Sequence, residues 1–226
     1  MEHPHTGHRD RLRERFLTEG LEHFEPHNAL ELLLFYACPR IDTNELAHRL
    51  IARFGSLSGV LNAPAEELVK IKGLGRNAAV LLRLTPQLMR FYALDSHDRE
   101  PLDSAARMCE YAKACFWGAS AEELRVFCLD DTLRIRENAM LTEGAFSSVP
   151  LSARRIVETA FRARSDLIIL AHNHPNGNEL PSEQDDIATR QLFRLLKQLG
   201  ITLLDHIIVG GGKAFSMRDG GYFYNL

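Results

Sequence analysis

Two different patterns of apolar and polar positions divide the chain. Over residues 9–94, apolar residues recur with the 3.6-residue period of an α-helix, in short segments that brief polar loops separate. In one of them, "DTNELAHRLIARFG", a helix can begin after Asp42, Thr43 or Asn44 as its N-cap and end at Gly55. Several short helices with brief connections predict a compact all-α bundle.

From residue 105 onward, strand-like and helix-like segments alternate. Strands are indicated by "ELRVFCLD", "DLIILAHNH" and "ITLLDHIIVGGG", a hairpin by "TLRIRENAMLTE", and a short edge strand by "KAFSM". Helices are indicated by "ARMCEYAKACFW", "SARRIVETAFRAR" and "SEQDDIATRQLFRLLKQLG". Strands interleaved with helices favour an α/β arrangement around a mixed sheet.

The length of 226 residues is comfortable for two small domains. The segment "DSHDREPLDS", residues 95–104, is polar, charged and interrupted by Pro101, so we predict a linker there; a surface loop inside one domain is the alternative. The predicted fold is therefore two-domain α+β. It has an all-α domain at 1–94, the linker at 95–104, and an α/β domain at 105–226.

Composition is that of an ordinary globular protein, with 45% hydrophobic and 25% charged residues. No apolar run approaches the ~18 residues of a membrane span, and the polar start does not resemble a secretory signal. We therefore expect a cytoplasmic protein without a membrane partner. The four cysteines form no C-x-x-C pair, and in a reducing compartment we expect small core residues rather than disulfides or zinc ligands.

The net charge of −3 predicts no global attraction to nucleic acid. Residues 1–94 carry 12 basic and 11 acidic side chains, whereas residues 95–226 carry 15 and 19. Any contact with DNA would therefore depend on a local basic patch or on backbone amides.

Two histidines lie two residues apart just beyond the apolar segment "DLIIL". Residues i and i+2 of a strand face the same way, so His172 and His174 would project side by side, close enough to bind one metal ion. Core or surface histidines are the alternative. Ser182 and Asp185 open the following helix, where a helix cap alone explains them. If that helix start points back at the strand, Asp185 becomes a third ligand and leaves one position for water, as in catalytic zinc sites.

The segment "HNHPNGNELPSEQD" is similar to the JAMM (MPN-type) metalloprotease signature, His-x-His-Pro followed by Ser-x-x-Asp. The wider frame resembles the RadC-type DNA repair protein family, through "EELRVFCLD", "EGAFSSV", "RRIVETAFRARSDLIILAHNHPNG" and "LLDHIIVGGGKAFSM". In the first half, "GHRDRLRERF", "LELLLFYACPR" and "FGSLSGVLNAPAEELVKIKGLGRNAAVLL" extend the resemblance over nearly the whole chain. It implies a helix-hairpin-helix-like bundle followed by a mixed-sheet JAMM/MPN (cytidine deaminase-like) α/β domain.

The resemblance also implies roles for individual residues. His172, His174 and Asp185 would bind Zn²⁺, and Ser182 would stabilise the oxyanion that forms when an amide is cleaved. A glutamate on an earlier strand would be the general base, and the match places it at Glu122.

Two other acids compete with Glu122 for the role of base. Glu123 is adjacent, but a slip of one residue turns a strand side chain to the opposite face; Glu143, in "LTEGAF", is a weaker candidate. Asp205 and His206, in "LLDHIIVG", also match the family, either as a network beneath the ligands or as a satisfied buried pair.

The segment "IKGLGRNAA" resembles a helix-hairpin-helix turn. Gly73 and Gly75 allow a tight backbone, the amides of the next helix could hold a phosphate, and Lys72 and Arg76 flank the turn. Sequence-independent DNA binding through residues 1–94 is the functional interpretation, and a simple interhelical turn is the alternative.

Three functions are compatible with these features. The leading hypothesis is a RadC-type zinc metallohydrolase that cleaves an amide or isopeptide bond of a protein or peptide, with a link to DNA repair. The second is a DNA-binding, repair-associated protein whose metal site is structural or acts on nucleic acid. The third is a catalytically silent scaffold, against which the intact His, His, Asp and Ser pattern argues.

Overall fold

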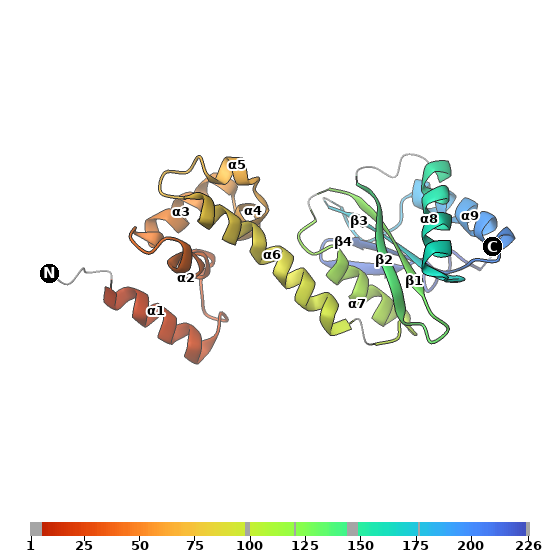
Figure 1. Cartoon of the computed structure of the whole chain (residues 1–226), viewed down its shortest axis with the longest axis horizontal. Helices are drawn as coiled ribbons and strands as arrows, with labels where there is room; N and C mark the ends of the chain where they lie inside the picture. Colours follow the sequence, from red (N-terminus) through yellow and green to blue (C-terminus); the bar gives the residue numbers. More distant parts are fainter. Residues whose placement is uncertain (1–5, 98–99, 120, 144–148, 176, 225–226) are drawn as a thin grey trace. The chain divides into compact units, whose positions relative to one another are not determined.

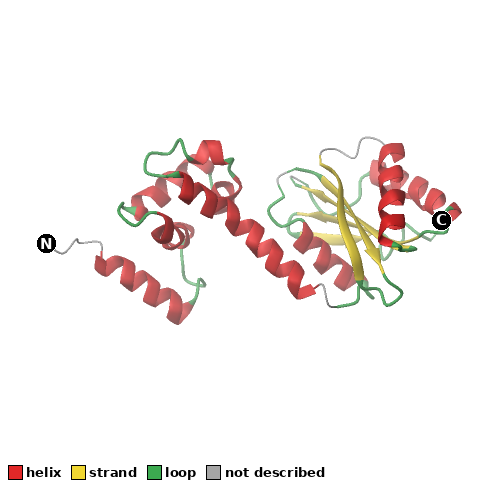
Figure 2. Cartoon of the chain, viewed as in Figure 1, coloured by secondary structure: helices red, strands yellow, loops and turns green. Residues whose placement is uncertain are grey.

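The computed structural model describes residues 6–97, 100–119, 121–143, 149–175 and 177–224. The chain separates into two compact units, Met1–Leu88 and Met89–Leu226. The amino-terminal unit is helical, and the carboxy-terminal unit is a mixed sheet with helices (Figure 2). The structure thus confirms a two-domain α+β protein at this level of description.

Helices make up the amino-terminal unit. In order, the elements are α1 Thr6–Glu19, α2 Pro26–Ala37, α3 Thr43–Phe54, α4 Leu57–Asn62, α5 Ala65–Leu68 and α6 Arg76–His97. The apolar faces of α2 to α6 meet in one core, to which α2 contributes Leu30 and Leu34 and α3 contributes Leu46 and Leu50, while α1 packs through Leu12 in a separate cluster with α2. The burial of these periodic positions against one another stabilises helices that would be too short to persist alone.

The start of α3 decides between the three cap candidates. The Asp42 carboxylate accepts hydrogen bonds from the backbone N–H groups of Asn44 at 2.9 Å and Glu45 at 3.2 Å. Gly55 ends the helix with a φ of 84°, a conformation that costs glycine little. Asp42 is therefore the N-cap, and the predicted helix end is confirmed.

Helix α6 crosses the boundary between the two units and runs into the segment expected to be a linker. Residues 95–97 are helical, residues 98–99 lie outside the described part of the chain, and residues 100–104 are neither helix nor strand. Leu94 packs against the carboxy-terminal core. This contact stabilises helical structure around residue 94. Helix α6 therefore extends to His97, into the polar segment that was predicted to be a linker.

The carboxy-terminal unit is built on a sheet with strand order β2-β1-β3-β4-β5. The elements that follow α6 are α7 Ala105–Cys115, β1 Glu123–Leu129, β2 Ile135–Glu143, α8 Val149–Ala163, β3 Leu167–His174, α9 Glu183–Gln198, β4 Thr202–Gly210 and β5 Lys213–Ser216. β3 and β4 are parallel, and the other neighbouring pairs are antiparallel. The sheet is thus mixed, as predicted.

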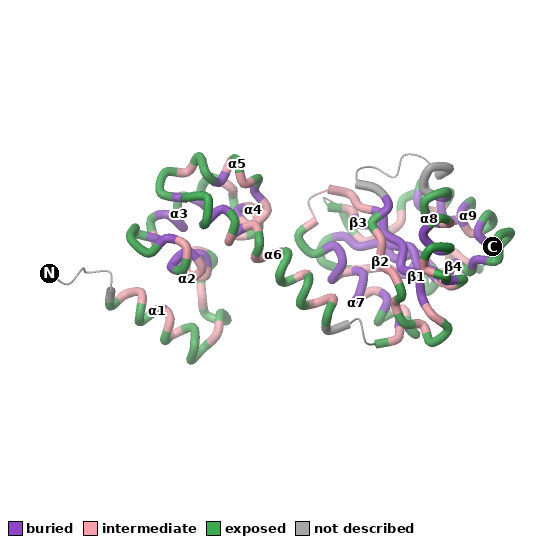
Figure 3. Tube along the Cα trace, viewed as in Figure 1, coloured by how far each residue is buried: buried purple, intermediate pink, exposed green. Residues whose placement is uncertain are grey.

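Helices cover both faces of this sheet (Figure 1). One face of the central strands packs against α7, through residues such as Phe127 and Ile169. The other packs against α8 and α9, through residues such as Val126 and Leu170. Burial on both faces explains the continuous apolar runs of β1 and β3, and these strands are largely buried in Figure 3.

The cysteines agree with their expected role as small core residues. All four carry free thiols, and Cys38, Cys115 and Cys128 are buried. Within the described ranges, none of the helices combines the length and apolar character that crossing a bilayer requires.

Candidate metal centre

Strand β3 positions the two histidines. Its backbone stays paired with β4 to the last residue, where His174 lies opposite Gly210, and His172 lies opposite Leu124 of β1. The extended backbone that the sequence interpretation required therefore continues through both histidines. Because strand side chains alternate, both imidazoles project on the same face, the one that packs against α8 and α9.

The start of α9 brings the carboxylate to them. Ser182 is the N-cap: its hydroxyl accepts from the Asp185 backbone N–H at 3.2 Å, and the Asp185 side chain accepts from the Ser182 backbone N–H at 2.7 Å. This reciprocal capping box is the arrangement that the helix-cap interpretation predicted. It also holds Asp185 in one orientation, so the cap and the ligand interpretations are compatible.

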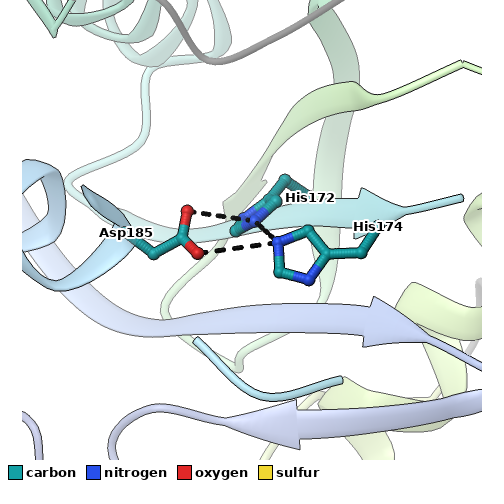
Figure 4. Close-up of side chains that lie close together, drawn as sticks. All are labelled: His172, His174 and Asp185. Atoms are coloured by element: carbon teal, nitrogen blue, oxygen red, sulfur yellow. Dashed lines mark hydrogen bonds and ion pairs between the residues drawn. The ribbon is translucent and has the colours of Figure 1, made fainter. Parts of the chain in front are cut away.

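Asp185, His172 and His174 converge on one point (Figure 4). The two Nε2 atoms lie 2.9 Å apart, and Asp185 offers Oδ1 at 3.2 Å from His172 Nε2 and Oδ2 at 3.5 Å from His174 Nε2. Ligands held about 2.1 Å from one ion at tetrahedral angles lie roughly 3.4 Å apart. These three side chains, called here the His-His-Asp site, are the group within the described residues that could hold a metal ion.

The protonation states of His174 and Asp185 are those expected of residues that bind a cation. His174 Nδ1 lies 2.9 Å from the Asn178 carbonyl oxygen, which can only accept, so Nδ1 carries the ring proton and Nε2 directs a lone pair into the site. Burial acts to raise the pKa of Asp185, but a positive charge at the position of His172, with the hydrogen bonds from Ser182, outweighs it and holds that pKa below its usual range. A lone pair and a carboxylate that face one another are stabilised by a cation between them.

A second layer of buried groups lies behind the histidines. His172 Nδ1 is 2.9 Å from Nε2 of His206, and His206 Nδ1 is 2.7 Å from the Thr189 hydroxyl. Burial first, and then the neighbouring His172, lower the pKa of His206 to about 3. Asp205 bonds elsewhere, to the backbone N–H groups of His206 and Arg218 and to the Ser216 hydroxyl. Of the two family-matching residues, His206 therefore contacts a ligand and Asp205 supports the backbone beside it.

Comparison of the sequence with known proteins agrees with this geometry. Residues 102–222 match the family described as RadC-like JAB domain, and residues 5–80 match the one described as UPF0758 N-terminal. The chain belongs to the RadC-like JAB domain family. It is 34% identical over 221 residues to a UPF0758 protein of Ruegeria pomeroyi, and the match covers 95% of this chain and 96% of that protein. The His-His-Asp site and Ser182 lie inside the RadC-like region.

The register of the RadC-like sheet separates the two adjacent glutamates. Glu122 precedes β1, and an extended backbone at this position would give its side chain the same face as Leu124, which lies opposite His172. Glu123 has the opposite face and pairs with Arg125, with Oε2 2.8 Å from a guanidinium nitrogen. Glu143 ends β2, and its side chain lies outside the described part of the structure.

Asn173 fixes the backbone around Glu122. Its side-chain oxygen accepts from the Glu123 N–H at 2.7 Å, and its amide donates to the Ala121 carbonyl at 3.0 Å. These bonds bracket Glu122 from the adjacent strand, so its backbone position is set by a buried side chain. Nothing in the sequence pattern distinguished this asparagine from a turn residue.

A cavity of about 530 Å³ opens at the end of β3, and most of its wall, including the residues from Glu110 to Ala119, lies on the α7 face of the sheet, opposite the His-His-Asp site. His174, Trp117 and the glycines of the β4–β5 turn belong to its wall. The His174 side chain is 22% exposed, whereas that of His172 is 1% exposed. The His-His-Asp site is therefore approached from the His174 side.

In the UPF0758-type amino-terminal unit, the predicted turn has one buried and four exposed residues. Leu74 is buried, and Lys72, Gly73, Gly75 and Arg76 are exposed. Gly73 has a φ of 93°, which requires glycine, and Arg49 donates to the Lys72 carbonyl at 3.0 Å. Arg76 is the first residue of α6. The turn therefore presents its two cations and the start of α6 at the surface.

Sequence reasoning missed two groups that touch the ligands. Thr189 lies four residues after Asp185 on α9, and this i, i+4 spacing was a signal that could have identified it. The Asn178 carbonyl holds His174, but a backbone group carries no signature in the sequence.

Proposed function

We propose that the carboxy-terminal unit is a zinc-dependent hydrolase of the RadC type that cleaves an amide or isopeptide bond. The convergence of two imidazole nitrogens and a carboxylate on one point supports this proposal most strongly. Two histidines and one acid leave a fourth position for water, which distinguishes catalytic zinc sites from closed structural ones. We also propose a cytidine deaminase-like topology for the sheet.

Bound zinc would supply a Lewis acid that lowers the pKa of a water molecule toward ~7. His172, His174 and Asp185 would hold the ion. Glu122, the residue that precedes β1, would accept the proton of the attacking water and return it to the leaving amine. The exposed Ser182 hydroxyl, 2.6 Å from Asp185 Oδ2, would donate to the oxyanion after turning from that carboxylate.

The cavity that His174 borders, on the α7 face of the sheet, would receive a part of the substrate that extends beyond the His-His-Asp site. Trp117 is half exposed on its wall and offers an apolar contact. These features favour a peptide or protein segment over a small polar substrate.

Metal analysis tests the site itself. We expect the purified chain to carry about one zinc per molecule and Asp185→Asn to lose it. The matched control is Asp186→Asn, because Asp186 lies on the same helical turn but pairs with Arg190 at 2.8 Å. Zinc that is absent from the wild type, or that both variants retain equally, would exclude the metal assignment.

Hydrolysis of a peptide and isopeptide library tests the chemistry. We expect cleavage by the zinc-loaded wild type and a loss of at least about 10²-fold in Glu122→Gln, with unchanged zinc content. Glu179→Gln, a change outside the proposed set, should retain full activity. Zinc binding without cleavage of any library member would favour a structural metal, or one that acts on nucleic acid.

For the amino-terminal unit, we propose DNA-backbone binding by a helix-hairpin-helix-like turn at Lys72, Gly73, Gly75 and Arg76. The surface position of the two cations beside the start of a 22-residue helix favours this proposal. DNA affinity of the full chain should fall with salt, and Lys72→Ala and Arg76→Ala should each reduce the slope by about 1. No binding at low salt would remove both the DNA contact and the proposed link to DNA repair.

A further inference from the structure

One buried hydrogen-bond chain connects two members of the His-His-Asp site. The Thr189 hydroxyl lies 2.6 Å from the backbone carbonyl oxygen of Asp185 and 2.7 Å from His206 Nδ1. On its other side, His206 Nε2 lies 2.9 Å from His172 Nδ1. All four residues are at most 4% exposed, so bulk water does not compete for these bonds.

The Thr189 hydroxyl has two groups that can only accept within reach, the Asp185 carbonyl oxygen at 2.6 Å and the Met217 sulfur at 3.6 Å, and a thioether sulfur is the weaker acceptor. A carbonyl oxygen cannot donate, and two oxygens 2.6 Å apart without a proton between them would repel. The hydroxyl therefore donates to Asp185. Its oxygen then acts as acceptor toward His206, so Nδ1 of His206 carries the ring proton.

The donor and acceptor roles of His206 determine those of His172. His206 is completely buried and, within the described part of the chain, the partners of its ring are His172 and Thr189 rather than a carboxylate, so a charged imidazolium there would be costly and the ring is neutral. With its proton on Nδ1, His206 presents a lone pair at Nε2. His172 must then donate from Nδ1, which leaves its Nε2 without a proton, facing His174 and Asp185.

We propose that Thr189 and His206 are positioning residues that hold His172 as the Nδ1-protonated tautomer, the form able to bind a metal ion through Nε2. This proposal rests on the proposed metal site. Asn178 does the same for His174, so both imidazoles are prepared for the ion before it binds. The same series of hydrogen bonds begins at the backbone carbonyl of Asp185 and ends at His172. It therefore links two of the three proposed metal ligands.

Thr189→Val removes the hydroxyl with little change of volume. His206 Nδ1 then loses its acceptor, and a buried N–H without a partner costs more than a buried lone pair. His206 should therefore move its proton to Nε2 and donate to His172 Nδ1. His172 in turn becomes protonated at Nε2, on the side that faces the metal.

Nitrogen-15 NMR of the histidine-labelled, metal-free full chain reads the tautomer directly. At about pH 8 most imidazoles are neutral, and the His172 signals are assigned from their loss in His172→Gln. We expect a protonated Nδ1 in the wild type and an unprotonated one in Thr189→Val. Thr189→Ser restores the hydroxyl and should restore the wild-type pattern. Thr159→Val, at another buried threonine of the same unit, should leave it unchanged.

Zinc titration supplies the second measurement. Thr189→Val should raise the zinc dissociation constant by about 10–100-fold, and Thr189→Ser should stay within a few-fold of wild type. His206→Leu, which removes the acceptor for His172, should weaken zinc binding to a similar extent. It also keeps the proposal testable if Thr189→Val fails to fold.

The proposal is overturned if Nδ1 of His172 has the same protonation in wild type and Thr189→Val, or if zinc binds the folded variants as tightly as wild type. Neither measurement involves hydrolysis. A protein that shows the tautomer change and the affinity loss but cleaves no peptide would refute the proposed hydrolase and leave the positioning role intact.

Discussion

Glu122 and Glu123 are adjacent in sequence, yet replacing each with glutamine should have opposite consequences. Glu123 pairs with Arg125 on the α7 side of the sheet, where the two side chains are 13% and 9% exposed. Burial and the charge of Arg125 lower the pKa of Arg90, and Glu123 opposes this effect. The negative charge of Glu123 thus compensates the positive charges of Arg125 and Arg90. Glu122 would instead point to the side of the sheet that carries the histidines.

The magnitude follows from this environment. Removing one partner of a buried ion pair costs about 3–5 kcal/mol, because the remaining charge is left uncompensated. Some exposure remains, and Arg125 keeps its contacts with Asn138 at 3.3 Å and with the Phe116 ring. We therefore expect Glu123→Gln to lower the free energy of unfolding by about 2–3 kcal/mol, or the melting temperature by roughly 5–10 °C.

Urea denaturation followed by tryptophan fluorescence is the assay. Trp117 is the only tryptophan of the chain, so its emission reports on the carboxy-terminal unit. Glu122→Gln should change the free energy of unfolding by less than about 0.5 kcal/mol while removing the proposed hydrolytic activity. If Glu123→Gln is neutral and Glu122→Gln is strongly destabilising, the register argument that separates their faces is wrong.

Three further predictions concern other parts of the fold. Asp42→Ala should destabilise the helical unit by about 1 kcal/mol, measured by circular dichroism, since two N–H groups of α3 lose their acceptor; Asp42→Asn should retain most of the stability. Gly73→Ala should cost roughly 1–2 kcal/mol because its φ is 93°, whereas Gly75→Ala, with no atom near its added methyl group, should cost less; equal costs would contradict the assigned turn. Burial raises the pKa of the Cys115 thiol from 9.0 to about 11, so the unfolded chain loses this proton first as the pH rises. Between pH 7 and about pH 10, wild type should therefore lose about 1.4 kcal/mol more stability than Cys115→Ala; identical pH profiles would show that the thiol titrates normally.

Much of the local structure could be predicted from the sequence. The end of α3 at Gly55 and the strand before His172 depend on interactions within a few residues, whereas the choice of Asp42 among three cap candidates needed the structure. The end of α6 could not be predicted in this way, because the contact of Leu94 with the carboxy-terminal core extends a helix whose polar sequence suggested a linker. The separation of Glu122 from Glu123 likewise needed the pairing of β1 with β3.

The sequence by itself determined that His172 and His174 share a face and that Ser182 caps the helix carrying Asp185. Strand alternation and capping are local consequences of backbone geometry, and a motif two or three residues long contains them. Only the tertiary structure decided that Asp185 meets the histidines and that Thr189 and His206 lie behind them. Those contacts join β3, α9 and β4, and they exist because the apolar faces of α9 and the sheet bury each other, which no local pattern specifies.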